Sequence, residues 1–159
     1  NMKLCFWVGM VIGIAVFLWP SPYIFKLGKY TELELEKISP QYKAINKAYL
    51  NHGLWGAIIF MPILLILIFI VMIFEVEPRT NILAAYIPAV FSAASIFYGT
   101  FAAKNGVYPT SKYFGAKTTY AFDENNGIER YARLQIIISV VVGILAALVT
   151  VVLILLNLK

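Results

Sequence analysis

The chain has 159 residues, of which 61% are hydrophobic and 13% are charged, and its formal net charge is +5. A soluble domain usually has about a quarter of its residues charged, so the composition argues against a soluble fold and predicts an integral membrane protein. A single cysteine excludes an intramolecular disulfide. No nucleic-acid-binding motif accompanies the basic charge, so anionic lipid headgroups are the expected partner of the cations.

Four apolar runs, none with an Asp, Glu, Lys, Arg or His, are long enough to cross a bilayer, which takes about 20 helical residues. They are Leu4–Phe25, Gly53–Phe74, Ile82–Ala103 and Leu134–Leu158. The first run also resembles a secretory signal, but Trp19 stands where a small-residue cleavage site is expected, so we predict a retained helix. The fold class predicted is all-α: a bundle of four transmembrane helices forming a single membrane domain over residues 1–159.

The basic residues predict the orientation of these spans, because cytoplasmic loops carry an excess of Lys and Arg. Ten lie in the two long loops, approximately residues 26–52 and 104–133, and three lie at the termini and in the short loop. We therefore expect the long loops in the cytoplasm and both termini outside, in the cytoplasmic membrane if the source is bacterial.

The first long loop contains the signals of two short helices. Thr31-x-x-Glu34 is a capping-box pattern, and Ser39-Pro40 reads as an N-cap followed by proline at the first helical position. The second of these helices is expected to be an amphipathic juxtamembrane helix with one aromatic and aliphatic face, formed by Tyr42, Ile45 and Tyr49. The alternatives are that it continues straight into the second span, or that it is a solvated connector.

The second long loop has little helical periodicity and many aromatic residues. The stretch 123–127, DENNG, is a turn signal, and Asn126 or Gly127 is expected to cap a helix that starts near Ile128. The aromatic residues are too numerous for a solvated loop, so we expect them to dock on headgroups, the bundle or a partner; they are Tyr108, Tyr113, Phe114, Tyr120 and Phe122.

Small residues predict which spans contact each other, since they let helix backbones approach closely in lipid. The candidate packing positions are Gly9 and Gly13 in the first span, Gly99 in the third and Gly143 in the fourth. After Ala57 the second span is almost entirely bulky. Spans one, three and four should therefore pack together, while span two faces lipid or a neighbouring subunit.

Few residues suggest chemistry. The absence of ionisable side chains within the spans argues against a proton-coupled carrier. A polar strip on the third span would line a pore or make hydrogen bonds between helices; it consists of Ser92, Ser95, Tyr98 and Thr100. The lone His52 reads as an ordinary interfacial histidine, and we predict no catalytic residue, cofactor or metal site.

One stretch resembles a known family. ERYARLQ, Glu129–Gln135, resembles the E-R-x-x-R-A-Q stretch of the membrane-associated eicosanoid and glutathione metabolism proteins, and KAYLN, Lys47–Asn51, is similar to their R-A-x-x-N. Those proteins are small four-helix proteins with long cytoplasmic loops. Their motif precedes span two, whereas ERYARLQ precedes span four, so the stretch remains a resemblance. From charge alone, Arg130 and Arg133 anchor the fourth span at the interface and can pair with Glu129.

Three functional classes follow. The first is a non-catalytic accessory, assembly or immunity-type protein that binds another membrane or envelope component. Its candidate partner or lipid contacts are Tyr42, Tyr49, Tyr113, Phe114, Tyr120, Arg130 and Arg133. The alternatives are a homo-oligomeric channel or facilitator lined by the polar strip, and a small membrane enzyme acting on a lipid or lipophilic substrate at the cytoplasmic face.

Overall fold

The computed structural model describes residues 2–73, 79–110 and 118–157. Its elements in chain order are α1 (Met2–Leu18), α2 (Ser21–Ile24), β1 (Gly28–Tyr30), α3 (Glu32–Ile38), the 3-10 helix η1 (Pro40–Tyr42), α4 (Ile45–Ile73), α5 (Arg79–Asn105), β2 (Val107–Thr110), β3 (Thr119–Phe122) and α6 (Gly127–Asn157). Within these ranges, four stretches are helical, long and apolar enough to cross a membrane. They are Phe6–Ile24, Ile45–Ile66, Ile82–Asn105 and Gly127–Leu156.

The second and fourth long helices begin earlier than the apolar runs do. α4 starts at Ile45, directly after Ala44. The positive φ of Ala44, 64°, interrupts the helical backbone between η1 and α4. α6 starts at Gly127, after Asn126 with a φ of 56°, as the turn signal predicted. From Ile45 onward the segment continues directly into the second span, which was one of the two alternatives. The expected amphipathic helix with Tyr42, Ile45 and Tyr49 on one face is wrong, because Tyr42 lies in η1, before Ala44.

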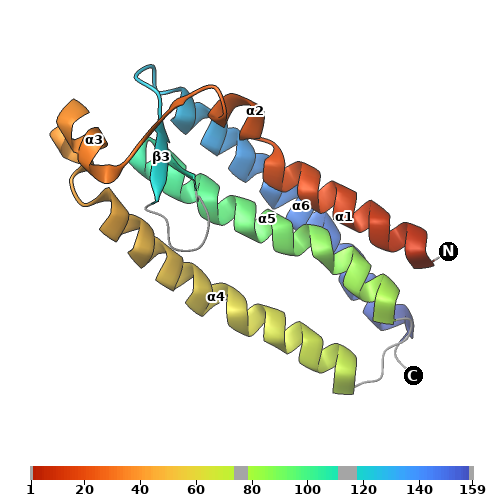
Figure 1. Ribbon diagram of the computed structural model, residues 1–159. Coiled ribbons are helices and arrows are strands. Elements are labelled where there is room, and N and C mark those ends of the chain that lie inside the picture. The colour runs from red at the N-terminus through yellow and green to blue at the C-terminus, as the bar shows by residue number, and fades with distance from the viewer. Residues whose placement is uncertain (1, 74–78, 111–117, 158–159) are drawn as a thin grey trace.

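Helices α1, α5 and α6 lie side by side along most of their length (Figure 1). Small residues allow this approach, because an added Cβ at each predicted packing glycine would crowd a neighbouring helix. It would meet the Ala84 carbonyl at Gly9, the Phe91 ring at Gly13 (2.6 Å), Ile136 at Gly99 (2.9 Å) and Ser92 at Gly143 (3.2 Å). Helix α4 stands apart from this group and approaches α5 mainly at the end near α3 and the sheet (Figure 1).

The prediction of an all-α fold is wrong in one respect, because the two long loops contribute a small sheet. Its strand order is β1-β3-β2, with both pairs antiparallel. Tyr30 pairs with Tyr120 on one side of β3, and Pro109 pairs with Tyr120 on the other. The sequence did not reveal this sheet because β1 and β3 are far apart in the chain, and each strand has only three or four residues.

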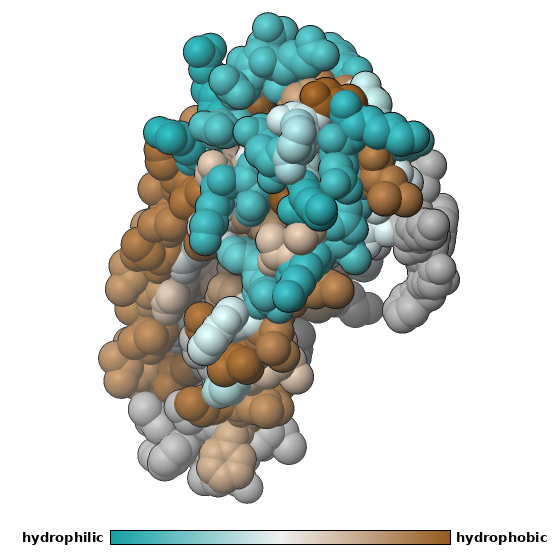
Figure 2. Space-filling view, turned by 90° about the vertical axis from the view of Figure 1, so that its left-hand side faces the viewer, coloured by the Kyte–Doolittle hydropathy of each residue, from teal (hydrophilic) through white to brown (hydrophobic). Residues whose placement is uncertain are grey.

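The sheet, α3 and the ends of the long helices form a hydrophilic cap, which we call the polar end. Figure 2, seen from this end, shows hydrophilic residues gathered over it and hydrophobic residues on the helices along its margin. Within the cap, α3 begins as predicted: Glu34 accepts hydrogen bonds from the backbone N–H (2.7 Å) and the hydroxyl (2.9 Å) of Thr31. These bonds lower the pKa of the Glu34 carboxyl.

A second polar contact joins α2 to the turn before α6. The Tyr23 hydroxyl donates to the Asp123 carboxylate, which also accepts the backbone N–H of Asn125 at 3.0 Å. The Tyr23 ring stacks on Tyr131, with centroids 4.0 Å apart. The hydrogen bond from Tyr23 is the main cause that lowers the pKa of Asp123, and the bond from Asn125 lowers it further. The contact therefore fixes the connection after α1 against the first turns of α6.

The close contact at Gly9 predicts the effect of a larger residue. Gly9→Leu should lower the free energy of unfolding in detergent by about 1–3 kcal/mol, because its side chain would press on the Ala84 backbone. The matched control is Ala15→Leu, at an exposed position of the same helix, which should change stability by less than about 0.5 kcal/mol. Equal effects of the two substitutions would contradict the tight packing of α1 on α5.

The Tyr23–Asp123 hydrogen bond predicts a pH dependence. Tyr23→Phe should destabilise the chain by about 1 kcal/mol at pH 7. Because the folded-state pKa of Asp123 is lowered, the stabilisation is present above its unfolded pKa and is lost as the pH falls through the folded value. Thermal unfolding at pH 7 and pH 3 should therefore show a smaller difference between Tyr23→Phe and wild type at pH 3. Tyr131→Phe, which keeps the stacked ring, is the control, and a pH-independent difference would refute the assignment.

Candidate functional site

A groove of about 550 Å³ separates α4 from α5 below the polar end. On the α4 side it is lined by Gly53, Gly56, Ala57 and Phe60, and on the α5 side by Ala89, Ala93, Phe97 and Tyr98 among others. The walls are almost wholly apolar, and no charged side chain lines them. We call this cavity the α4–α5 groove. Its lining is suited to an apolar ligand.

The groove is closed at the polar end by a contact around His52. Its Nε2 atom lies 3.0 Å from the carbonyl oxygen of Phe97 and 3.2 Å from the hydroxyl of Thr100. The imidazole ring also packs on Phe97, with centroids 4.6 Å apart. Thr100, predicted as part of the polar strip, thus faces α4. No sequence pattern indicates this contact, because a single histidine before an apolar run has no identifiable partner.

An aromatic core lies above this contact and joins α3, α4, α5 and the sheet. Its buried members are Leu35, Tyr42, Ile45, Phe101, Val107 and Tyr120. The Tyr120 side chain is fully enclosed, and its hydroxyl donates to the Asn46 Oδ1 atom at 3.0 Å. Tyr49 packs edge-on against Phe101, with centroids 5.2 Å apart. Burial is the main cause that raises the pKa of Tyr120 to about 12, and the nearby charge of Glu32 adds to it. The phenol therefore stays a neutral donor.

Three predicted contact residues are therefore brought together inside the chain. Tyr42 is 6% exposed and Tyr120 is fully buried, so both stabilise the polar end in this structure, while Tyr49 is partly buried beside them. Arg130 and Arg133 are exposed on the first turns of α6. The expected pairing of Arg133 with Glu129 is absent, since the only ion pair in the described part of the chain joins Lys43 and Glu36 at 3.9 Å. Tyr113 and Phe114 lie outside the described residues.

The predicted polar strip is divided between different surroundings. Ser92 and Ser95 are fully buried among the helices, and Ser95 donates to the Val16 carbonyl of α1 at 3.4 Å. The Ser92 hydroxyl and the buried Ser139 hydroxyl of α6 have no hydrogen-bond partner among the described residues. The two serines of α5 thus face the interior of the α1–α5–α6 group. Tyr98 instead lines a cavity at the polar end, and Thr100 contacts His52 of α4.

A second cavity, of about 580 Å³, lies at the polar end between the end of α1, α2, β1, α5 and β2; we call it the polar pocket. Its polar lining consists of Ser21, Lys29, Tyr98, Tyr108 and Thr110. Its apolar lining includes Phe17, Leu18, Ile24 and Phe25. Tyr98 stacks against Tyr108, with ring centroids 6.3 Å apart. The pocket thus combines an ammonium group, phenols and hydrocarbon walls.

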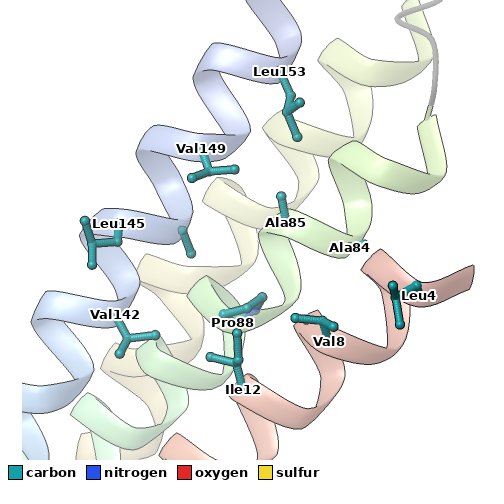
Figure 3. Close-up of a pocket in the computed structure, with 12 residues that line it drawn as sticks. Leu4, Val8, Ile12, Ala84, Ala85, Pro88, Val142, Leu145, Val149 and Leu153 are labelled. Atoms are coloured by element: carbon teal, nitrogen blue, oxygen red, sulfur yellow. The ribbon is translucent and has the colours of Figure 1, made fainter. Parts of the chain in front are cut away.

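A third cavity, also of about 580 Å³, lies between α1, α5 and α6 toward the opposite end (Figure 3). Aliphatic side chains from all three helices point toward it, among them Ile12, Pro88 and Val149 (Figure 3). It contains no group that could take part in acid–base or nucleophilic chemistry. Among the described residues there is also no group of three or more His, Cys, Asp or Glu side chains that could hold a metal ion.

The Tyr120–Asn46 hydrogen bond can be tested by a double-mutant cycle. Tyr120→Phe and Asn46→Ala should each destabilise the chain, and the double variant should lose less than the sum, with a coupling energy of about 0.5–1.5 kcal/mol. The measurement is thermal or denaturant unfolding of the purified protein in detergent. Additive losses would show that the phenol does not hold α4 through this amide.

Comparisons with known proteins give no relative for this chain. No protein-family model matches it, and neither does any curated protein or solved structure. The stretch 129–135 that resembles a known motif forms the first turns of α6, with its two arginines exposed. The α4–α5 groove and the polar pocket are therefore the candidate sites of this chain.

Proposed function

We propose that the chain is an integral membrane protein whose polar end lies in the cytoplasm and whose termini lie outside. The distribution of charge supports this orientation. Ten of the 13 basic residues lie in the sequence ranges 26–52 and 104–133, and cytoplasmic loops are enriched in Lys and Arg. Hydrophobic side chains cover the helices beside this end (Figure 2).

Within the membrane, the proposed function is non-catalytic: the chain binds an apolar transmembrane helix of another membrane protein in the α4–α5 groove. The observation that carries this proposal is the separation of α4 from α5 (Figure 1). α4 is attached near the polar end, around Tyr49 and His52, and its outer surface is bulky and exposed, as at Ile59, Leu65 and Phe69. Below these contacts, the groove leaves room for another helix against α4 and α5.

The lining of the groove favours a helix over a loosely held lipid chain. Half of the lining residues are glycine or alanine, among them Gly53, Gly56 and Ala57 of α4 and Ala89 and Ala93 of α5. Helices in lipid associate through such small residues, because close approach of the backbones supplies dispersion contacts that lipid chains match poorly. The surfaces of α4 and α6 outside the groove carry larger aliphatic and aromatic side chains.

The two alternatives have weaker support. A homo-oligomeric channel lined by the polar strip requires Ser92 and Ser95 to face a pore, but both are enclosed among the helices of one subunit. A membrane enzyme requires reactive groups at the cytoplasmic face. There, His52 is engaged by α5, and the two arginines of α6 stand exposed outside the cavities described above.

Site-specific photocrosslinking in native membranes tests the groove. Benzoylphenylalanine at Phe60, which lines the groove, should give one discrete adduct whose crosslinked peptide comes from an apolar span of a different protein. The same probe at Phe69, which is 65% exposed on α4, is the matched control and should crosslink to lipid. Ala93→Leu should fill the groove and reduce the Phe60 adduct about tenfold, corresponding to about 1.4 kcal/mol, whereas Ala15→Leu should not.

The other outcomes distinguish the alternatives. Lipid adducts from both probe positions would refute a helix-binding groove. An adduct between two copies of this chain would refute the proposal that the partner is a different protein, and it would favour the homo-oligomer. Native mass spectrometry of the unmodified complex provides a second measurement, since a heteromeric complex must contain a second polypeptide in fixed ratio.

A further inference from the structure

The polar pocket contains a cation that the described part of the chain does not neutralise. The Lys29 ammonium lies 5.2 Å from the centre of the Phe25 ring, in a cation–π contact. No carboxylate of the described residues lies within 4.0 Å of it, because the only ion pair among them joins Lys43 and Glu36. Lys29 therefore carries a positive charge at the rim of a cavity of about 580 Å³.

A second hydrogen-bond donor, the Tyr108 phenol of β2, lines the same pocket. The Gln135 side chain is 1% exposed, and its Nε2 atom donates to the Tyr108 hydroxyl at 3.2 Å. Because that phenol oxygen accepts this bond, its own proton is available for another acceptor. Burial raises the pKa of Tyr108, so the phenol stays protonated at neutral pH. An ammonium and a phenol facing one cavity are donors suited to an anion.

The remaining walls are hydrocarbon and continue onto the outer surface of the molecule. Leu18 and Phe25 line the pocket and are 50% and 72% exposed. Trp19, the residue after Leu18, is 51% exposed at the same level. Aromatic side chains of this kind are enriched where a transmembrane helix meets the headgroup zone. A ligand in the pocket would therefore have a polar anionic part and an apolar part that leaves along α1.

We propose that the polar pocket binds the headgroup of an anionic glycerophospholipid, with its phosphate at Lys29 and Tyr108 and its acyl chains along α1. This inference rests on the proposed insertion of α1 in the membrane and is independent of the α4–α5 groove. A free phosphate ion shares the anionic chemistry, but it would gain nothing from the apolar wall formed by Phe17, Leu18 and Phe25. The pocket accommodates a headgroup, and the acyl chains contact the exposed surface beyond it.

Trp19 provides a local reporter for this site. In the background Trp7→Phe, Trp55→Phe, it is the only tryptophan, since the chain has three. The purified protein is placed in bilayers of phosphatidylcholine that contain either brominated phosphatidylglycerol or brominated phosphatidylcholine. Bromine quenches tryptophan at contact, so the ratio of the two quenching efficiencies at equal mole fraction reports preference for the anionic lipid. We expect a preference of about fivefold, the effect of about 1 kcal/mol from one lysine near a headgroup.

Variants separate the pocket from the general surface charge. Lys29→Gln should reduce the preference to about one, and Lys29→Arg should retain it. Lys26→Gln removes the same charge from an exposed lysine three positions away that does not line the pocket, and it should leave the preference unchanged. Equal losses in Lys26→Gln and Lys29→Gln would overturn the site, because they would indicate a diffuse electrostatic attraction.

Two further outcomes identify the source of failure. If both brominated lipids quench equally, while inorganic phosphate binds the purified protein and loses that binding in Lys29→Gln, the ligand is the free ion and the lipid proposal is overturned. Equal quenching by both brominated lipids without such phosphate binding overturns the site altogether, yet it leaves α1 embedded in the bilayer. An absence of quenching by either lipid would instead refute the membrane insertion on which the site depends.

Discussion

The burial of Tyr120 is the constraint on which the arrangement of the polar end depends. This residue lies on β3, the central strand, and pairs on one side with Tyr30 and on the other with Pro109. Its ring belongs to the aromatic core, and its hydroxyl reaches Asn46 on the first turns of α4. A single side chain therefore connects two loops that are far apart in the chain to the start of the second long helix. With this end fixed, the direction of α4 is set, and so is its separation from α5.

The three packed helices α1, α5 and α6 differ from α4 in how they contact their neighbours. α1, α5 and α6 contact each other through small residues and buried hydroxyls, as at Gly9 and at Ser95. α4 approaches α5 closely at Gly56, where an added Cβ would lie 2.7 Å from the Phe97 ring, and farther from the polar end it presents bulky side chains such as Leu65 and Phe69. In a bilayer, lipid tails solvate such side chains as well as another helix would, so hydrophobicity alone does not draw α4 onto the bundle. The α4–α5 groove follows from this difference in side-chain size, combined with the fixed contact around His52.

Apolar length and local turn chemistry were sufficient to predict the four long helices, the start of α3 at Thr31 and the start of α6 at Gly127. These features depend on neighbouring residues. The sheet, the enclosure of Tyr120 and the bonds of His52 depend on pairs separated by tens of residues, and no periodicity reveals such pairs. Polarity alone also failed to separate Ser95, which faces α1, from Thr100, which faces α4. The candidate cavities could be found only once these distant pairs were placed.

Tyr98 links the two proposed binding sites. It lines both the α4–α5 groove and the polar pocket, and its ring contacts Phe17 at 6.0 Å, Phe97 at 5.2 Å and Tyr108 at 6.3 Å between centroids. Phe97 in turn packs on His52, the residue that holds α4 to α5. A ligand that shifts the Tyr98 ring therefore changes a wall of both cavities at once. Coupling between two binding sites is reciprocal. If a bound lipid changes the affinity for a partner helix by some factor, the bound helix must change the affinity for the lipid by the same factor.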